Sequence, residues 1–464
     1  MNIYLSLGVF FIGLALLARV RVTQFCRYLL RFPSWRTLGI SEAAIAFVAL
    51  LYLLSNPFWY EYSGSLTLVC LCCLALVEGG LIIVAEHRVR KATEYLLSHY
   101  YWFSVPIALF LGCLSICLLA FAYVGEVHRI DACQSDDHIE VVCGLTNPED
   151  IVSTPDDAFL ITPEFGGIGP YHALSERRDG RIMLTDIVSQ TTTPMAVSYA
   201  ANTWGDGACE RTAAMPLSPQ GIDLLARQDG AYQLAVINHA PFESIEMFEL
   251  AVVQDTWQLI WRGCVGVPSV NYLNDVSLAV DGSLYVTHMY PPDFALAEAL
   301  AVGLFKYVTG YVLRWDPTNG FGQVPGSEGA HPNGVVYDAN EELLYVAYTF
   351  GDRVAVIDMQ KGAAIERLYM NSPDNLVLKE GWLWATSWDH EMLDMIACED
   401  KITCALPFSV YQIEPRTLRI EKQWHFHHTQ MGMATTAFPL GNRIWLGGAR
   451  SNRLGSFLSL AAKG

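Results

Sequence analysis

A short unit of turn residues followed by an apolar strand recurs six times between residues 155 and 449. Copies begin with turns such as Asp229-Gly230 or Asp281-Gly282 and continue as an alternating or continuous apolar run. They follow one another at roughly 40–75 residues, near the length of one propeller blade. The repeat predicts an all-β array, most simply a propeller, with a pair of packed sheets as the alternative. The copies are PDDAFLIT (155–162), DGAYQLAVIN (229–238), DGSLYVTH (281–288), ANEELLYVAY (339–348), KEGWLWATSW (379–388) and LGNRIWLGGA (440–449).

A polar motif stands shortly before most of these strands, in the same phase of the repeat. Equivalent positions of successive blades are related by rotation about the central channel of a propeller, so the motifs are expected to meet at the axis. The sixth unit carries MATT (433–436) at this position instead. The five motifs are Glu149-Asp150, Gln220-Gly221, Asn274-Asp275, Asn333-Gly334 and Asp374-Asn375.

The predicted cluster offers carboxylate and amide oxygens. Such hard donors suit calcium, which takes about 6–8 oxygen ligands, and the cluster lacks the His and Cys that zinc prefers. Carboxylates gathered without a cation raise one another's pKa values, so a bound cation is the simplest compensation. Each motif alone is also an ordinary turn sequence, which is the competing interpretation.

The first 125 residues have a different character and hold four apolar runs. A spanning helix needs about 20 mostly apolar residues. The sequence therefore predicts a transmembrane domain of about four helices over residues 1–125, followed by a propeller over residues 126–464. A cleaved signal peptide is the alternative for the first run, although no positive charge precedes it. The runs are Ile3–Ala18, Ile40–Leu54, Leu66–Ala85 and Trp102–Val124.

The charge distribution predicts how this membrane domain is oriented. Arginine-rich segments follow the first and third runs, while the loop after the second has no Lys or Arg, and positive loops stay in the cytoplasm. Both chain ends, and with them the propeller, are therefore expected outside the cytoplasm. Residues 126–464 contain 21 Lys and Arg against 42 Asp and Glu. This acidic balance argues against nucleic acid as a partner.

Six cysteines fall in the predicted outer domain, where an oxidising compartment would permit three disulfides with 15 possible pairings. The pairs closest in sequence, Cys133/Cys143 and Cys398/Cys404, are our preferred predictions.

The outer domain resembles the paraoxonase/arylesterase family and, more loosely, gluconolactonase-like and strictosidine-synthase-like propellers. The resemblance runs in order over most of residues 143–461 and leaves the membrane part outside it. It is carried by NPEDIVSTPDDAFLIT, PLSPQGIDLL, LAVINHAP, YLNDVSLAVDGSLYVTH, HPNGVVYDANEELLYVAY and SPDNLVLKEGWLWATSW.

The resemblance implies a six-bladed propeller with two calcium ions in its central tunnel. By matching motifs, the catalytic ion near the tunnel mouth would be held by Glu149, Asn274, Asn333, Asp374 and Asn375. The deeper, structural ion would be held by Asp150, Asp275 and the backbone carbonyl of Ile222. The family usually closes its ring with a disulfide, but no cysteine follows Cys404, so closure is expected from strand pairing.

The family hydrolyses lactones and aryl esters, and some members act on organophosphates. The expected function is therefore a membrane-anchored, calcium-dependent hydrolase of such a substrate. Family members usually use a pair of histidines to accept the proton of the attacking water, but the first position is Gln220 here and only His239 is retained. The candidates for this role are His239, His288 or His390, and Asp374.

Two other functions compete with hydrolysis. Loss of a catalytic histidine at Gln220 also fits a non-enzymatic, calcium-stabilised propeller that acts as a binding or sensor module. The third possibility is that the work lies in the membrane part, where Glu78 is a deeply placed carboxylate.

Overall fold

The computed structural model divides the chain into two compact units, Met1–Glu126 and Val127–Gly464, and each is described by itself. The structure describes residues 30–31, 34–55, 65–99, 113, 130, 132–165, 179–294, 296–389, 403 and 405–459.

The first unit contains helices α3 (Trp35–Ser55) and α4 (Ser65–Ser98), which cover the second and third apolar runs. They meet at small residues, since a Cβ added to Gly39 would lie 2.8 Å from the carbonyl oxygen of Gly79. Within the described residues, no helix is both long and apolar enough to cross a membrane. The predicted span 3–18 lies outside the described residues, as does 102–124 apart from Cys113.

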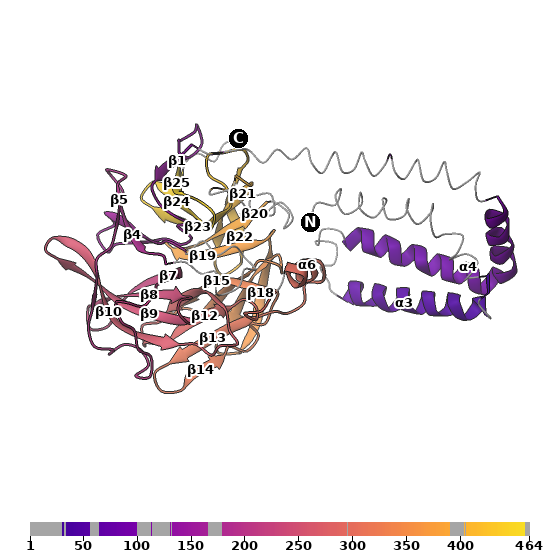
Figure 1. Cartoon of the computed structure of the whole chain (residues 1–464), viewed down its shortest axis with the longest axis horizontal. Helices are drawn as coiled ribbons and strands as arrows, with labels where there is room; N and C mark the ends of the chain where they lie inside the picture. The colour runs from indigo at the N-terminus through magenta and orange to yellow at the C-terminus, as the bar shows by residue number, and fades with distance from the viewer. Residues whose placement is uncertain are drawn as a thin grey trace. The chain divides into compact units, whose positions relative to one another are not determined.

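The second unit consists of six antiparallel sheets, the blades of a propeller (Figure 1). Blade two carries a fifth strand, β6, which pairs in parallel with β10. Blades one to three are β2 (Val152–Ser153), β3 (Phe159–Pro163), β4 (Ile182–Asp186) and β5 (Thr192–Pro194); β6 (Val197–Tyr199), β7 (Pro219–Ala226), β8 (Tyr232–Asn238), β9 (Ser244–Val253) and β10 (Thr256–Gly266); and β11 (Leu273–Leu278), β12 (Leu284–His288), β13 (Tyr311–Asp316) and β14 (Gly320–Gln323). Blades four to six are β15 (Pro332–Asp338), β16 (Leu343–Tyr348), β17 (Arg353–Asp358) and β18 (Ala363–Tyr369); β19 (Pro373–Lys379), β20 (Trp382–Trp388), β21 (Phe408–Glu414) and β22 (Arg419–Phe426); and β23 (Ala434–Leu440), β24 (Arg443–Gly448) and β25 (Arg453–Leu458), completed by β1 (Glu140–Cys143).

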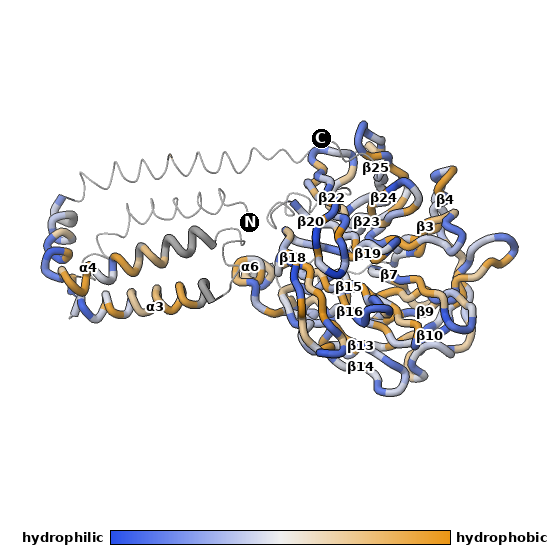
Figure 2. The backbone as a smooth tube through the Cα atoms, turned by 180° about the vertical axis from the view of Figure 1, so that it is seen from behind, coloured by the Kyte–Doolittle hydropathy of each residue, from blue (hydrophilic) through white to orange (hydrophobic). Residues whose placement is uncertain are grey.

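The recurring apolar unit of the sequence is the second strand of each blade. It forms β3, β8, β12, β16, β20 and β24. These strands are buried almost throughout because neighbouring blades cover them, and apolar residues from two adjacent blades share one core. Figure 2 shows apolar segments running along strands such as β15 and β16, with mainly hydrophilic loops between strands. The predicted all-β propeller is therefore confirmed, with six blades.

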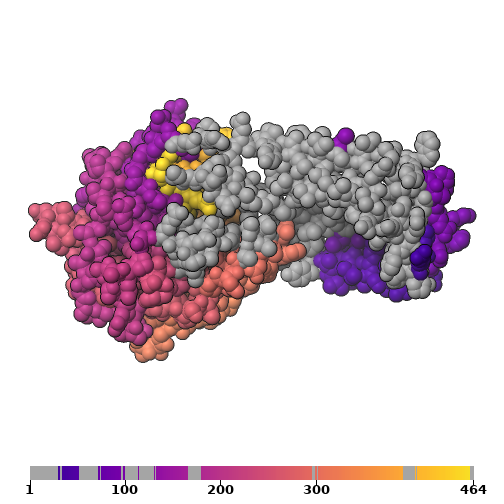
Figure 3. All heavy atoms as spheres, in the orientation of Figure 1, coloured from indigo at the N-terminus to yellow at the C-terminus, as the bar shows by residue number. Residues whose placement is uncertain are grey.

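Strand pairing closes the ring. Strand β1 pairs antiparallel with β25, so the start and the end of the domain share one sheet. Figure 3 shows the same closure as yellow C-terminal atoms beside purple atoms from the start of the propeller. The expectation that strand pairing, and not a terminal disulfide, closes this ring is confirmed.

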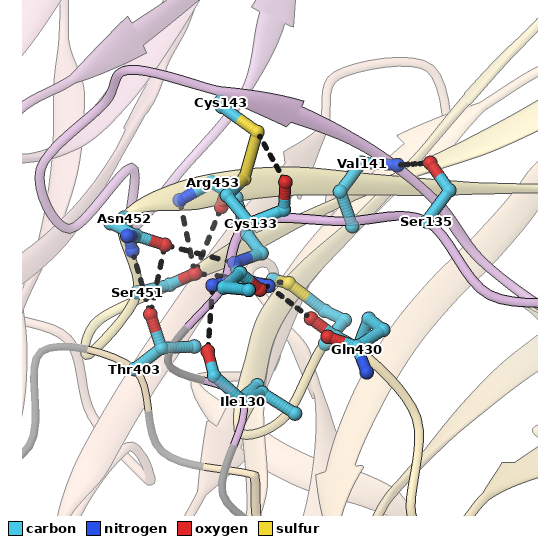
Figure 4. The surroundings of a disulfide bond; sticks show 12 residues. Ile130, Cys133, Ser135, Val141, Cys143, Thr403, Gln430, Ser451, Asn452 and Arg453 are labelled. Carbon is cyan, nitrogen blue, oxygen red and sulfur yellow. Dashed lines mark hydrogen bonds between the residues drawn. A yellow bond between two sulfur atoms is a disulfide. The ribbon is translucent and has the colours of Figure 1, made fainter.

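The segment leading into β1 is secured in two further ways (Figure 4). The predicted disulfide Cys133–Cys143 is present. Arg453 of β25 is fully buried and donates to the carbonyl oxygens of Ile130 at 2.9 Å and Ala132 at 3.1 Å. A second disulfide, Cys209–Cys264, was not among our preferred pairs, and it joins a long loop to β10. The predicted pair Cys398/Cys404 lies outside the described residues.

Candidate functional site

The polar motifs lie where the innermost strand of each blade carries a β-bulge. In blade three, Leu273 pairs with His288 and Val276 pairs with Val286, so three steps on β11 pass two on β12. The two residues without a partner in the ladder are Asn274 and Asp275. The same shift occurs in β7, β15, β19 and β23, and blade one shows it between its bridge at Pro148 and its pairing at Val152.

The bulges bring the inner strands of adjacent blades very close together. A Cβ added to Gly221 would lie 2.6 Å from the carbonyl oxygen of Asn274. One added to Gly334 would lie 2.6 Å from the carbonyl oxygen of Asp374. Glycine is required at both positions because any side chain would collide with the backbone of the next blade. The second residue of two motifs is therefore a spacer that lets the polar residues gather.

The aspartate at the second position of two motifs, Asp150 and Asp275, is satisfied by backbone N–H groups. Asp150 accepts hydrogen bonds from the backbone N–H of Ile151 at 2.8 Å and of Ile222 in blade two at 2.9 Å. Asp275 accepts from the backbone N–H of Val276 at 2.8 Å and of Val335 in blade four at 2.8 Å. These carboxylates link the inner strands of adjacent blades, one to two and three to four.

The predicted ligands of the mouth ion are only partly satisfied. Asn375 donates to Oε1 of Glu149 at 3.1 Å, and Asn333 donates to Oγ1 of Thr349 at 3.0 Å. The remaining acceptor oxygens have no hydrogen-bond partner although they are enclosed, and buried acceptors are rarely left in this state. Four of the five predicted ligands of the mouth ion carry such an oxygen. They are Oε2 of Glu149 and the Oδ1 atoms of Asn274, Asn333 and Asn375.

Burial and mutual repulsion make this cluster unfavourable for charge. Burial, followed by the charge of Asp150, raises the pKa values of Glu149 and Asp275 well above their usual range. Burial also raises the pKa of Asp374 well above its usual range, that of Asp150 to about 7 and that of Asp223 to about 6. A cation would relieve this cost, because it favours the charged form of each carboxylate.

The chemistry of the donors fits a hard cation. No group of three or more His, Cys, Asp and Glu side chains placed to hold a metal ion occurs in the part of the chain that the structure describes. A cation at the mouth would therefore depend on the amide oxygens of the asparagines together with Glu149 and Asp374. Carboxylate and amide oxygens are the ligands that calcium takes.

A cavity of about 80 Å³ opens over this cluster. The cavity has room for a small ligand, since a single water molecule needs only about 10–15 Å³ of such volume. Its floor is polar and its walls are mostly aromatic and apolar. The lining residues are Glu149, Phe165, Gln220, Tyr272, Asn274, Met289, Tyr290, His331, Asn333, Phe350, Asp374, Trp388, Met433, Ala449 and Arg450.

Two of the histidine candidates, His239 and His288, do not line this cavity. His239 is completely buried; its Nδ1 lies 3.0 Å from both carboxylate oxygens of Glu243, and its Nε2 lies 2.5 Å from Oε1 of Gln220. Gln220 therefore stands between His239 and the cavity. His288 accepts a hydrogen bond at Nδ1 from the backbone N–H of Tyr272 at 3.1 Å, and burial lowers its pKa to about 4. His390 lies outside the described residues.

The comparison with known families decides what kind of propeller this is. Residues 132–397, more than half of the chain, match the family described as Arylesterase. The chain belongs to the arylesterase family.

This arylesterase-family chain has one similar curated protein worth noting, mechanosensory abnormality protein 6 of Caenorhabditis elegans. The two are 27% identical over 173 residues, which is 36% of this chain and 44% of that protein. The chain thus spans less than half the length of this curated relative.

Solved structures with a similar course of the chain include two from bacteria. A gluconolactonase from Xanthomonas campestris is 16% identical, with 71% of this chain and 92% of that one covered and a TM-score of 0.39. The calcium-binding protein regucalcin from Agrobacterium tumefaciens is 10% identical, with 68% and 92% covered and a TM-score of 0.38. A luciferin-regenerating enzyme is 12% identical, with 70% and 96% covered and a TM-score of 0.42.

The arylesterase-family cavity is lined by a histidine that is not among the predicted candidates. His331 precedes Pro332-Asn333, and its ring stacks on Tyr290 and Phe350. The helix α6 (Leu296–Phe305) packs against this aromatic wall through Ala299 and Val302. The sequence signal for this histidine is its position two residues before the predicted ligand Asn333.

Proposed function

We propose that this arylesterase-family propeller is a calcium-dependent hydrolase of lactones or aryl esters. Family membership supports a hydrolase-type function. The observation that carries the calcium dependence is the set of four enclosed acceptor oxygens without partners, all on residues of the predicted mouth site. An enclosed set of unpaired oxygens costs stability unless something binds it.

The mouth ion would be held by Glu149, Asn274, Asn333, Asp374 and Asn375. When bound, calcium supplies a Lewis acid that polarises a carbonyl oxygen and stabilises the developing oxyanion. A second, deeper ion would use Asp150, Asp275 and the carbonyl of Ile222. Its support is weaker, because both of those aspartates already accept two backbone hydrogen bonds each.

The chain itself supplies binding and proton transfer. The aromatic wall excludes water and packs against the apolar part of the substrate, while the polar floor meets its carbonyl end. Among the candidate bases, Asp374 lines the cavity, whereas Gln220 separates His239 from it and His288 is held by Tyr272. We therefore assign the proton of the attacking water to the carboxylate of Asp374.

A second function is favoured by one specific observation, the contact between Gln220 and His239. With Nε2 facing Gln220 and Nδ1 facing Glu243, His239 has no ring nitrogen left for a substrate. A propeller with this arrangement would bind calcium and a small ligand at its mouth without turning it over.

One experiment separates the two functions. The full-length protein, purified in detergent, would be assayed on phenyl acetate and γ-butyrolactone with calcium and with chelator, and calcium binding would be measured in parallel. Hydrolysis that chelator abolishes supports the hydrolase. Calcium binding without hydrolysis of any ester or lactone in a wider panel would favour the binding module.

Matched variants on one blade sharpen this experiment. Asn333→Ala removes a proposed ligand, whereas Asn340→Ala removes an exposed asparagine of the turn that follows β15. Loss of calcium binding in the first variant alone supports the assigned site. Equal behaviour of the two variants would contradict it.

We also propose that the N-terminal unit anchors the protein in a membrane, with the propeller outside the cytoplasm. The four apolar runs and the arginine-rich loops support this arrangement, and the disulfides Cys133–Cys143 and Cys209–Cys264 fit an oxidising compartment. Alkaline extraction of membranes and labelling of the propeller with an impermeant reagent would test it. Release of the intact chain by alkali would contradict anchoring.

A further inference from the structure

His331 is the least expected residue of the cavity because its buried imidazole has an enclosed, unpaired nitrogen. Its side chain lines the cavity and the residue is 8% exposed. Its Nδ1 has no hydrogen-bond partner among the residues that the structure describes. A phenylalanine would fill the same space without leaving polar atoms unpaired. The choice of histidine therefore needs an explanation other than packing.

The neighbouring rings determine which part of the imidazole can meet a ligand. Tyr290 stacks on His331 with ring centroids 5.3 Å apart, and Phe350 stacks on it at 4.2 Å. With ring neighbours stacked on it, the imidazole presents mainly its edge to the cavity, and the edge carries the nitrogens. The arrangement thus turns a hydrogen-bonding edge, and not an apolar face, toward whatever enters.

The backbone at His331 is also held in a costly conformation. Its φ is +60°, in the left-handed region that residues other than glycine seldom adopt. Two hydrogen bonds fix it there, from its N–H to Oγ1 of Thr309 at 2.8 Å and from the N–H of Thr349 to its carbonyl oxygen at 3.0 Å. The same left-handed backbone occurs at the equivalent positions of three other blades, Asn147, Ser372 and Met433, so it belongs to the turn that leads into the inner strand.

We propose that His331 is a substrate-contacting residue that selects esters and lactones with a hydrogen-bonding oxygen, such as a hydroxyl group, on the carbon next to the scissile carbonyl. The carbonyl end would lie over Asn333 and Asp374, and the edge of the imidazole would pair with the additional oxygen. A neutral imidazole donates at one nitrogen and accepts at the other, so its edge can pair with a hydroxyl group. This inference rests on the proposed function.

The test compares two substrates that differ by one hydroxyl group. The full-length, calcium-loaded protein would be assayed on α-hydroxy-γ-butyrolactone and on γ-butyrolactone. We expect kcat/KM to favour the hydroxylated lactone by about tenfold. His331→Phe keeps the ring stack and should bring the ratio near one by slowing only the hydroxylated substrate. His427→Phe, at an exposed histidine, should leave the ratio unchanged.

Two results would overturn the proposal: a ratio that survives in His331→Phe, or an equal loss on both lactones, which would indicate packing alone. If His331→Phe does not fold, His331→Gly relieves the left-handed backbone, removes the ring and gives the same reading. If the wild-type protein hydrolyses neither lactone, the proposed function fails. Calorimetry would then compare the binding of 3-hydroxy-2-pyrrolidinone and 2-pyrrolidinone to the wild type and to His331→Phe. Binding that shows no preference dependent on His331 would then overturn the inference as well.

Discussion

Neighbouring residues of the same bulges differ in whether their buried side-chain oxygens are hydrogen-bonded. Asp150 and Asp275 are buried and fully hydrogen-bonded to backbone N–H groups, including those of the next blade. Glu149 and Asn274, one residue earlier, are equally buried but keep an unpaired oxygen. One bulge therefore supplies both a carboxylate that links two blades and an unpaired acceptor oxygen at the cavity. The difference teaches that stability and function are divided between adjacent positions.

The largest effect is expected at the cavity. Asp374→Asn should reduce hydrolysis by at least about 100-fold, because it removes both a proposed calcium ligand and the assigned proton acceptor. Steady-state kinetics with saturating calcium measures this. Thermal unfolding with chelator should change little. Asp316→Asn, at the end of β13, serves as the control and should retain activity. Full activity in Asp374→Asn would contradict both roles assigned to Asp374 at the cavity.

The next effect concerns stability. Asp275→Ala leaves the backbone N–H groups of Val276 and Val335 without an acceptor and should lower the free energy of unfolding by about 2–4 kcal/mol. Asn274→Ala should cost less than about 1 kcal/mol, since its amide makes only a weak contact with the sulfur of Met289. Denaturant titration in chelator compares the two variants. Equal losses would show that the two positions do not divide their roles.

Acidity should act on the metal-free protein in an unusual direction. The pKa of Asp150 rises from 3.8 to about 7 and that of Asp223 from 3.8 to about 6. Between the unfolded pKa of 3.8 and these raised folded values, the folded chain holds protons that the unfolded chain has lost. The free energy of unfolding therefore falls as pH rises through this window. We expect the Tm in chelator to be at least about 4 °C higher at pH 5.5 than at pH 7.5. With saturating calcium the order should reverse, because binding requires the charged carboxylates. The same order in both conditions would argue against a cation at this cluster.

The smallest effect is expected at Gln220. If Asp374 accepts the proton, Gln220→Ala should change kcat by less than about threefold, because His239 takes no part in the reaction. A pH–rate profile of the variant and the wild type checks this. A change of 30-fold or more, or a new ionisation in the profile, would show that the Gln220–His239 pair works in catalysis.

Much of the fold was predictable because it depends on local patterns. Turn residues followed by apolar strands predicted the second strand of every blade, and the missing terminal cysteine predicted closure by strand pairing. The phase of Glu149, Asn274, Asn333 and Asp374 predicted that they gather, because rotation of a repeated unit maps equal positions onto one axis. The short separation of Cys133 and Cys143 predicted their disulfide. The membrane helices and the orientation of the N-terminal unit stay predictions.

What the sequence alone determined, then, is the repeat and the chemical type of the donors, since both follow from residue order and from rotation about one axis. Only the tertiary structure decided which oxygens are satisfied, because that depends on which backbone N–H of the next blade faces them. It also placed Gln220 between His239 and the cavity and stacked His331 on Tyr290 and Phe350. These contacts join residues from separate loops and blades, and their geometry depends on packing distances that no local pattern encodes.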